Sequence, residues 1–458
     1  MVSGVMAKVF RADINNSYRE RPFVRGNSDI TPSAMPLDDQ RWRRNRRMTR
    51  SLTAPGRGPN VPTPSRPIPV PDVPVHPVLS LRSAGFASSE TVASVLDAGQ
   101  PAYTTSCQAA IALAARQMRI GSEHSVLLPA YHCTDMVEPF SALGASPRFY
   151  KIREDLSVDL DDLVGKIDAS TRAVVVVHYF GFPRSLRDLR RICDENDLLL
   201  LEDCAHSFFG ENDGEPLGSQ GDYAVASLWK FFPVLNGGCL LSARHQVADT
   251  APARQGAAAN LKAAVKIVEA ANYYHRLKAL QPVVRLLLAA GKVGKPQPSA
   301  SPAPNLAQGR QELPFPAQEA ASAPNQIELE MTGVERFLCH HVSWDRIVRR
   351  RRRRYRQLLS ALGQRAGCRP LLPELPPKVV PHLFPVWVDR LEDVFPKLED
   401  AALPLQRFGQ FLWPGVDESV CRVSSDYSHH LIQLPCHQEL RDDEVEWMIE
   451  RFCSIVSA

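Results

Sequence analysis

The stretch LLLLED, residues 198–203, is apolar at four successive positions and then ends in two carboxylates. A strand with one exposed face alternates apolar and polar residues, so the absence of alternation predicts a strand buried on both faces. RAVVVVHYF (172–180) has the same character, and the amphipathic segment SLRDLRRICDEND (185–197) lies between the two. This order of strand, helix and strand predicts parallel neighbours in a sheet that helices cover.

The same alternation of helix and strand signals begins near residue 85 and continues to residue 242. Upstream of residue 172 the expected elements are a loop that leads into a helix (104–121), a strand (125–130), a helix (133–143), a strand (147–152) and a helix (159–167). The fold class predicted is α/β, with a large, doubly wound and mostly parallel sheet. In such sheets ligands bind beyond the carboxyl ends of the strands, so the residues that follow each strand are the candidates for chemistry.

Three regions are expected along the chain. Residues 1–76 form a flexible extension rich in arginine and proline, because RWRRNRRMTR (41–50) and the proline-dense run 59–77 can bury little apolar surface. This extension is either a tail for nucleic acid or acidic lipid, or a solvated tail, or an artefact of an upstream translation start. Residues 77–310 form the large domain, with a helical insertion from about 243, and residues 311–458 form a helix and a small α/β C-terminal domain.

The C-terminal region contains an arginine run whose role the sequence leaves open. One helix is expected over about 325–361, and it carries six consecutive arginines, Arg349–Arg354. Consecutive residues point all round a helix, so the run favours a solvated or partner-facing surface over an anion site. HLFPVWV (382–388) predicts a strand and DDEVEWMIERF (442–452) a terminal helix.

Composition excludes several classes of protein. With 458 residues, 44% hydrophobic residues and a net charge of +4, the chain is typical of a soluble globular protein and has no general excess of positive charge for nucleic acid. The ten cysteines form no CxxC pair, so we expect reduced thiols, and the spacing of His178 and His206 with them fits no metal site. No secretory signal or membrane-spanning stretch is visible, which predicts a soluble, cytoplasmic protein without a membrane partner.

Two residues point to one cofactor. Asp203 ends the buried strand 198–203 and needs a cationic partner, which a protonated pyridine nitrogen, an arginine, a metal or a helix N-terminus would supply equally well. Lys230 lies among apolar residues in SLWKFFPVLNGG (227–238), which disfavours its charged form and favours attack on carbonyls; the alternative is a lysine that extends to the surface. Together, an acid after one strand and a lysine after the next match the needs of pyridoxal phosphate.

The cofactor's phosphate also requires a site. TTSCQAA (104–110) begins a helix with small polar residues, and the backbone N–H groups of a helix N-terminus bind phosphate. Three separate segments therefore point to pyridoxal 5'-phosphate.

At this level of detail the chain resembles the DegT/StrS-type sugar aminotransferases, which belong to the fold type I pyridoxal phosphate-dependent enzymes. The resemblance runs in order from about residue 84 to 456. The segments that carry it are TSCQAAI (105–111), LLPAYHC (127–133), VVHYFGFP (176–183), LEDCAHSFFG (201–210), LGSQGDYAVASLWK (217–230) and LIQLPCH (431–437). Counted back from Gly237 and Gly238, Lys230 falls on the family's lysine position.

The resemblance implies a role for each matching residue. Lys230 would hold the cofactor covalently and Asp203 would keep its ring nitrogen protonated. The other residues expected to bind the cofactor are His206 beside the ring, Ser227, Ser106, Cys107 and Gln108 at the phosphate, and Tyr131 or His132 stacked on the ring in place of the aromatic that Cys133 replaces.

The activity implied is that of a pyridoxal phosphate-dependent aminotransferase that takes an amino group from a donor such as glutamate. Its acceptor would be a nucleotide-linked keto-sugar for polysaccharide or natural-product synthesis, and the enzyme would be a homodimer. Ser227 and Lys230 are three residues apart where most members have five, and Cys107 and Gln108 replace a glycine and a threonine, which marks a divergent branch. Two alternatives stay open: another pyridoxal phosphate reaction such as elimination or dehydration, and a non-catalytic scaffold that kept the fold.

Overall fold

The computed structural model describes residues 72–83, 92–247, 252–277 and 328–457. The basic run 41–50 and the linker 295–309 lie outside these residues. None of the described helices combines the length and the apolar composition needed to span a bilayer.

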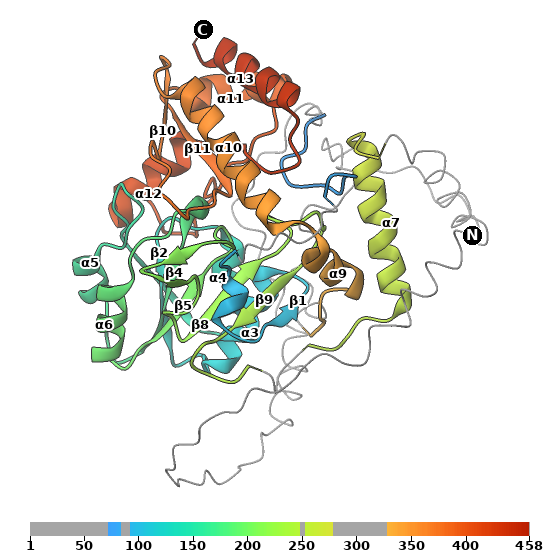
Figure 1. Cartoon of the computed structure of the whole chain (residues 1–458). Coiled ribbons are helices and arrows are strands. Elements are labelled where there is room, and N and C mark those ends of the chain that lie inside the picture. Colours follow the sequence, from blue (N-terminus) through green and yellow to red (C-terminus); the bar gives the residue numbers. More distant parts are fainter. Residues whose placement is uncertain (1–71, 84–91, 248–251, 278–327, 458) are drawn as a thin grey trace, which may run out of the picture. The chain divides into compact units, whose positions relative to one another are not determined.

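The large sheet confirms the predicted α/β class (Figure 1). Its seven strands follow the order β1-β9-β8-β5-β4-β2-β3. They are β1 (Ala102–Thr104), β2 (Ser125–Pro129), β3 (Ser146–Tyr150), β4 (Thr171–Val177), β5 (Leu199–Asp203), β8 (Tyr223–Ser227) and β9 (Gly238–Leu241). The pairs from β3 through β8 are parallel, while β9 runs antiparallel to both of its neighbours. The sheet is therefore mostly parallel, as the unbroken apolar runs predict.

Helices occur between these strands where the sequence predicts them. They are α3 (Cys107–Gln117), α4 (Thr134–Ala142), α5 (Leu160–Val164) and α6 (Arg187–Glu195). α3 and α4 pack on each other, α3 also packs on β8 and β9, and α6 packs on β5 (Figure 1). Short elements complete this part: the 3-10 helices η1 (Val95–Ala98) and η2 (Tyr179–Gly181), and the small hairpin β6 (Glu211–Asn212) and β7 (Glu215–Pro216).

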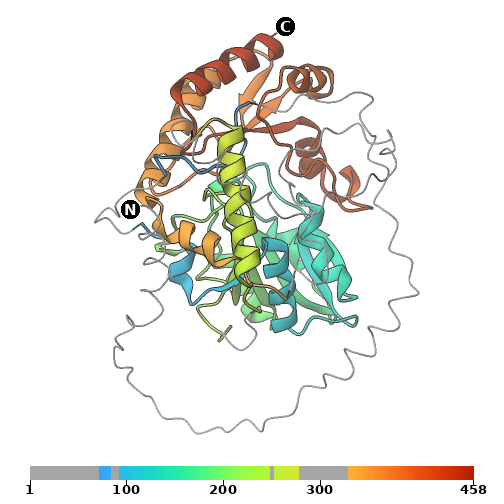
Figure 2. The same ribbon diagram turned by 90° about the vertical axis from the view of Figure 1, so that its right-hand side faces the viewer.

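The single helix expected over 325–361 is wrong, because the structure has two helices there. They are α9 (Gly333–His341) and α10 (Trp344–Leu362). Val342 is extended, and Ser343 starts α10 as its N-cap by accepting a hydrogen bond from the Arg346 N–H. Within the expected insertion from 243, the described helix is α7 (Ala257–Tyr273), which packs against α9 (Figure 2).

The C-terminal part is a small α/β unit, as the sequence predicts. An antiparallel sheet in the order β10-β11-β12 consists of β10 (Cys368–Pro370), β11 (Leu383–Val388) and β12 (Leu431–Pro435). Its helices are α11 (Leu391–Asp400), α12 (Glu418–His430) and α13 (Asp442–Val456), and α13 packs on both α10 and α11 (Figure 1). The predicted strand 382–388 and terminal helix 442–452 are confirmed.

Candidate active site

Lys230 and Asp203 lie at the same edge of the large sheet. β5 ends at Asp203 and β8 ends at Ser227, and the two strands are parallel neighbours in which Asp203 lies opposite Val225. Lys230 follows in a tight turn, in which the N–H groups of Phe231 and Phe232 donate to one carbonyl. The carboxylate and the amine thus meet where ligands bind in parallel sheets.

Asp203 is a buried acid that lacks full compensation. Its side chain is 4% exposed and accepts a hydrogen bond of 2.8 Å from the Ala205 N–H. Burial raises the pKa of the carboxyl, while that hydrogen bond and the charge of Lys230 oppose the rise. A protonated ring nitrogen placed against Asp203 would stabilise the ionised form further, so the carboxylate fits the part of the cofactor that the sequence assigned to it.

The neighbouring carboxylate, Glu202, differs because its bonding is complete. It accepts hydrogen bonds from the N–H groups of Gly218 and Gly221 and lies 2.9 Å from the Nε2 atom of His178. His178, Glu202 and Cys204 also bring three potential metal ligands within 4.8 Å of one another. Since the oxygens of Glu202 are already bound by the protein, the structure supports a structural role for this group.

The phosphate end of the site is formed where α3 begins. Ser106 is the N-cap of α3, and its Oγ accepts from the Ala109 N–H at 3.1 Å. The N–H groups of the first two helical residues, Cys107 and Gln108, have no acceptor within the helix. They are the donors that a phosphate needs.

β9 connects this helix end to β8. Gly238 in β9 pairs with Thr104 on one side and with Ser227 on the other. A side chain on Gly238 would place its Cβ 2.4 Å from the Ser106 carbonyl oxygen, so the backbones meet too closely for any residue but glycine. The Ser227 Oγ is buried and has no hydrogen-bond partner among the described residues, which leaves it for a phosphate oxygen.

The side chains of Cys107 and Gln108 have different surroundings. The Gln108 amide donates to Glu138 of α4 at 2.8 Å, which turns the side chain toward α4, and the backbone N–H of Gln108 stays available to a phosphate. The Cys107 thiol has a pKa well above its usual value because it is desolvated and lies near the charge of Asp203; Lys230 opposes this. Cys107 therefore borders the site as a neutral thiol.

His206 lies beside the predicted site and is buried. Its ring stacks on Phe180 at 5.7 Å between centroids and lies 4.8 Å from the ring of His382. Desolvation, with the charge of Lys230 second, holds the pKa of His206 well below its usual value, so the imidazole is neutral. Its Nδ1 has no partner among the described residues. A neutral ring with a free nitrogen fits a position beside the cofactor.

The side chains of Tyr131 and His132 are engaged by other groups of the protein. Tyr131 is fully buried and donates its hydroxyl to the Phe408 carbonyl at 2.8 Å. His132 is stacked on Phe149 and accepts the Trp413 N–H at 2.9 Å. Both rings are used in packing between the large sheet and the segment that follows α11.

Cys133 is the last residue of the segment 127–133, which also contains Tyr131 and His132, and it borders the site. Burial raises its pKa to about 12, and Lys230 and Asp203 are among the charges that act on it. A thiol thus stands at the place where the sequence led us to expect one of the two aromatic rings.

Four residues near Lys230 were not predicted. They are His76, Asp135, Arg351 and His382, whose pKa values or hydrogen bonds involve Lys230 directly. Asp135 could have been found, because it lies five residues after the predicted strand 125–130, near the sheet edge where ligands bind. His76 was assigned to the flexible extension, yet residues 72–76 pack against the C-terminal part in the structure.

The arginine run is not simply a solvated surface. Arg351 and Arg354 are fully buried, and Arg354 donates to the Leu440 carbonyl and to Asp442. The two residues are three positions apart and share one face of helix α10. Their guanidinium groups satisfy carbonyl groups of the segments packed against that face. The prediction of a solvated or partner-facing run is wrong for these two residues.

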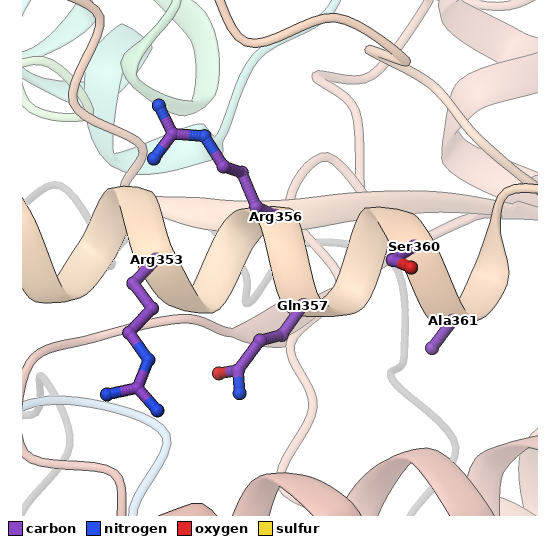
Figure 3. Close-up of a pocket in the computed structure, with 5 residues that line it drawn as sticks. All are labelled: Arg353, Arg356, Gln357, Ser360 and Ala361. Atoms are coloured by element: carbon purple, nitrogen blue, oxygen red, sulfur yellow. The ribbon is translucent and has the colours of Figure 1, made fainter.

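Exposed members of α10 border a cavity of about 470 Å³. Its lining residues are Arg353, Arg356, Gln357, Ser360 and Ala361. Figure 3 shows that Arg356 projects from the side of the helix opposite to Arg353 and Gln357. Arg353 also faces Asp442 at 3.5 Å, so the two guanidinium groups do not converge on one anion.

Comparisons with known proteins agree with this geometry. The model of the DegT/DnrJ/EryC1/StrS aminotransferase family matches residues 89–281. A GDP-perosamine synthase of Vibrio cholerae is 33% identical over 121 residues, which cover 26% of this chain and 33% of that protein. A dTDP-3-amino-3,4,6-trideoxy-alpha-D-glucose transaminase of Micromonospora megalomicea is 30% identical over 121 residues, which cover 26% and 32% of the two chains. The matched stretches thus span about a third of these relatives.

Solved structures show the same fold over more of the chain. The aminotransferase TlmJ from Streptoalloteichus hindustanus is 20% identical with a TM-score of 0.53, covering 78% of this chain and 86% of that one. A putative sugar aminotransferase from Streptococcus pneumoniae, in its PLP form, is 16% identical with a TM-score of 0.55, covering 80% and 93%. The fold is that of the fold type I aminotransferases. The match to the DegT/DnrJ/EryC1/StrS aminotransferase family model covers less than half of the chain, and both Asp203 and Lys230 lie within it.

Proposed function

We propose that this protein is a pyridoxal phosphate-dependent aminotransferase that acts on a nucleotide-linked keto-sugar, with glutamate as amino donor. The observation that carries the proposal is the meeting of Asp203 and Lys230 beyond two adjacent parallel strands. The Ser227 Oγ and the His206 Nδ1, which have no hydrogen-bond partner in the described part of the chain, support it. The named activities of the relatives support the sugar substrate.

The residues present fit pyridoxal phosphate. Lys230 would hold it through Nζ, Asp203 would accept from its ring nitrogen, and His206 would lie beside the ring. Ser227 Oγ and the first N–H groups of α3 would bind its phosphate. When bound, the cofactor supplies a conjugated ring that accepts electron density from the substrate.

The chain's own residues supply the rest of the chemistry. Nζ of Lys230 would take the proton from the carbon of the donor that bears the amino group. In the second half of the exchange it would deliver a proton to the sugar carbon that receives the amino group. Phe231 and Phe232, which follow Lys230 in the chain, are fully buried, whereas Lys230 itself is partly exposed. The buried carboxylate of Asp203 would lie next to the ring nitrogen of the cofactor and favour the protonated form of that nitrogen.

The first test is the visible spectrum of the purified protein with pyridoxal phosphate, before and after borohydride, beside Lys230→Ala. The proposal predicts a yellow band that borohydride fixes covalently and that the variant lacks. Glutamate should then convert the wild type to the pyridoxamine form. A band without this conversion by any amino donor would favour elimination or dehydration, and a protein that stays colourless would favour a scaffold.

The fold type I resemblance also supports a homodimer, because these enzymes build their active site at a dimer interface. Sedimentation at several protein concentrations would test it. A protein that stays a monomer at concentrations where it is fully active would contradict this part of the proposal.

A further inference from the structure

Residues 72–83, here called the strap, lie across the C-terminal part of the chain next to Lys230. The Pro74 carbonyl is 2.9 Å from Nε2 of His437, and Val73 packs with Leu440 and Val445. Farther along, the hydroxyl groups of two serines of the strap, Ser80 and Ser83, donate to Glu439. The strap is thus held at both ends, and it precedes the family-matched residues 89–281.

The middle of the strap brings His76 to the site. Its ring lies edge-on to Trp229 with 4.3 Å between centroids, and parallel to the ring of His382 at 6.1 Å. Trp229, Lys230 and His76 are the partly exposed residues of this group, whereas His382 is only 1% exposed. His76 therefore stands at the mouth of the site, and His382 lies behind it.

His382 is the least satisfied side chain of the group. Neither of its ring nitrogens has a hydrogen-bond partner among the described residues. Its neighbours are the rings of His206 at 4.8 Å, Phe231 at 5.6 Å and His76. A neutral imidazole has one donor and one acceptor nitrogen, and buried polar atoms without partners are costly. Two buried ring nitrogens next to Lys230 without partners in the described chain therefore indicate a ligand that forms hydrogen bonds with them.

The three imidazoles are uncharged. Desolvation comes first among the causes that lower the pKa of each one: to about 3 for His76, and well below the usual value for His206 and His382. Lys230 adds its positive charge to the same effect in all three. Uncharged rings that donate and accept suit hydroxyl groups, whereas carboxylates and phosphates require a cation or a set of N–H donors.

We propose that His382 and His76 bind hydroxyl groups of the sugar acceptor and are specificity-determining residues of the Lys230 site, with the strap positioning His76. This rests on the proposed aminotransferase function and extends it, because it divides the two substrates between different residues. The dicarboxylate donor is bound more strongly by cationic groups than by uncharged imidazoles. The pair therefore serves the sugar half of the exchange and not the donor half.

The test uses full-length His382→Leu, His382→Asn and His76→Leu proteins, with His430→Leu as the matched control. His430 is also an imidazole stacked on an aromatic ring, Trp387 at 4.4 Å, and its Nδ1 lies 3.1 Å from the Val388 carbonyl. Each half-reaction is followed separately by absorbance. Glutamate converts the protein to the pyridoxamine form, and GDP-, UDP- and dTDP-linked 4-keto-6-deoxyhexoses are the probes for the return reaction.

The expected result is a split between the two half-reactions. The donor half-reaction stays within twofold in every variant, while the KM for the keto-sugar rises at least tenfold in His382→Leu and in His76→Leu. His382→Asn, which keeps a donor and an acceptor, recovers part of this loss. An unchanged sugar KM, or equal slowing of both half-reactions, would overturn the proposal.

A second measurement needs neither substrate nor cofactor. If the His382 nitrogens await a ligand, His382→Leu raises the Tm of the cofactor-free protein, whereas the bonded control His430→Leu lowers it. A fall in Tm for both would identify His382 as a structural residue and overturn the assignment. A wild type that glutamate does not convert would instead contradict the proposed function, and the Tm comparison would still decide on His382.

Discussion

The guanidinium of Arg351 donates a hydrogen bond of 2.6 Å to the backbone carbonyl of Lys230. The same side chain donates to the carbonyls of Pro381 and His382 and to Oε1 of Gln438. Gln438 in turn donates to the carbonyl of Phe231 at 2.8 Å. Two side chains from the C-terminal part thus fix two successive carbonyls of the lysine turn.

This arrangement predicts a large effect of Arg351→Met. The change leaves several buried acceptors without a donor, each costing about 1–3 kcal/mol, so the free energy of unfolding should fall by about 3 kcal/mol or more. Arg351→Lys, which can reach one carbonyl, should lose less. Urea unfolding measures both variants, and pyridoxal phosphate binding shows whether Lys230 stays in place. Arg353→Met, an exposed change on the same helix, is the control and should stay within about 0.5 kcal/mol.

Two adjacent carboxylates should respond oppositely to neutralisation. Asp203→Asn should stabilise the cofactor-free protein at pH 7 by about 1–3 kcal/mol, because a partly compensated buried charge disappears. Glu202→Gln should destabilise it by about 3 kcal/mol, since His178 and two N–H groups lose their charged acceptor. Asp203→Asn should also abolish transamination, which separates the functional carboxylate from the structural one.

The pH dependence of the Asp203 effect follows from its raised pKa. The folded protein holds this proton to higher pH than the unfolded chain, so the residue's contribution to stability is present at low pH and is lost as pH rises. The difference between Asp203→Asn and the wild type should therefore be small near pH 4 and grow toward pH 7. Unfolding curves at several pH values measure it, and a difference that shrinks with rising pH would contradict the raised pKa.

A buried histidine predicts the opposite dependence. Nδ1 of His132 lies 3.0 Å from the Pro129 carbonyl, Nε2 accepts from Trp413, and desolvation lowers the pKa to about 4. The unfolded chain binds the proton below about pH 6.5 and the folded protein does not, so stability falls as pH drops from 6.5 toward 4. At pH 4.5 this residue alone should cost about 2.5 kcal/mol.

Substitution tests this assignment. In His132→Gln the titrating group is absent, so the loss of stability between pH 6.5 and 4.5 should be smaller than in the wild type. Equal slopes in the wild type and His132→Gln would show that His132 takes up its proton in the folded state.

Particular residues show how much of the fold and of the candidate site could be predicted from the sequence. The apolar runs that became β4 and β5 predict the sheet, because burial on both faces leaves a signal in every residue. Asp203 and Lys230 could be found for the same reason: each interrupts an apolar stretch at the end of a strand. A charged residue within an apolar stretch can be recognised from the sequence alone.

The residues that sequence analysis missed act across long separations. His382 and Arg351 are 152 and 121 positions from Lys230, and nothing in their own segments shows that they meet it. Arg351 was misjudged because a run of arginines is usually solvated, whereas here carbonyl acceptors from other segments satisfy it. His76 was missed because the proline-rich sequence around it gives no sign of a tertiary contact.

Gly238 gives the sharpest steric prediction. A Cβ there would lie 2.4 Å from both the carbonyl carbon and the carbonyl oxygen of Ser106, and 2.6 Å from the Cys107 nitrogen. These are backbone atoms at the start of α3, so they cannot rotate away as a side chain would. Gly238→Ala should therefore push the helix end from β9, lower the free energy of unfolding by about 2 kcal/mol or more, and weaken pyridoxal phosphate binding.

Gly256→Ala is the control for Gly238→Ala, because a Cβ on Gly256 meets nothing within 4 Å. It should change stability by less than about 0.5 kcal/mol and leave cofactor binding unchanged. Titration with pyridoxal phosphate under conditions in which both variants are folded separates the effect on cofactor binding from the effect on stability. Equal affinities in the two variants would mean that the first N–H groups of α3 do not bind the phosphate, because Gly238 holds that helix end in position beside Ser227.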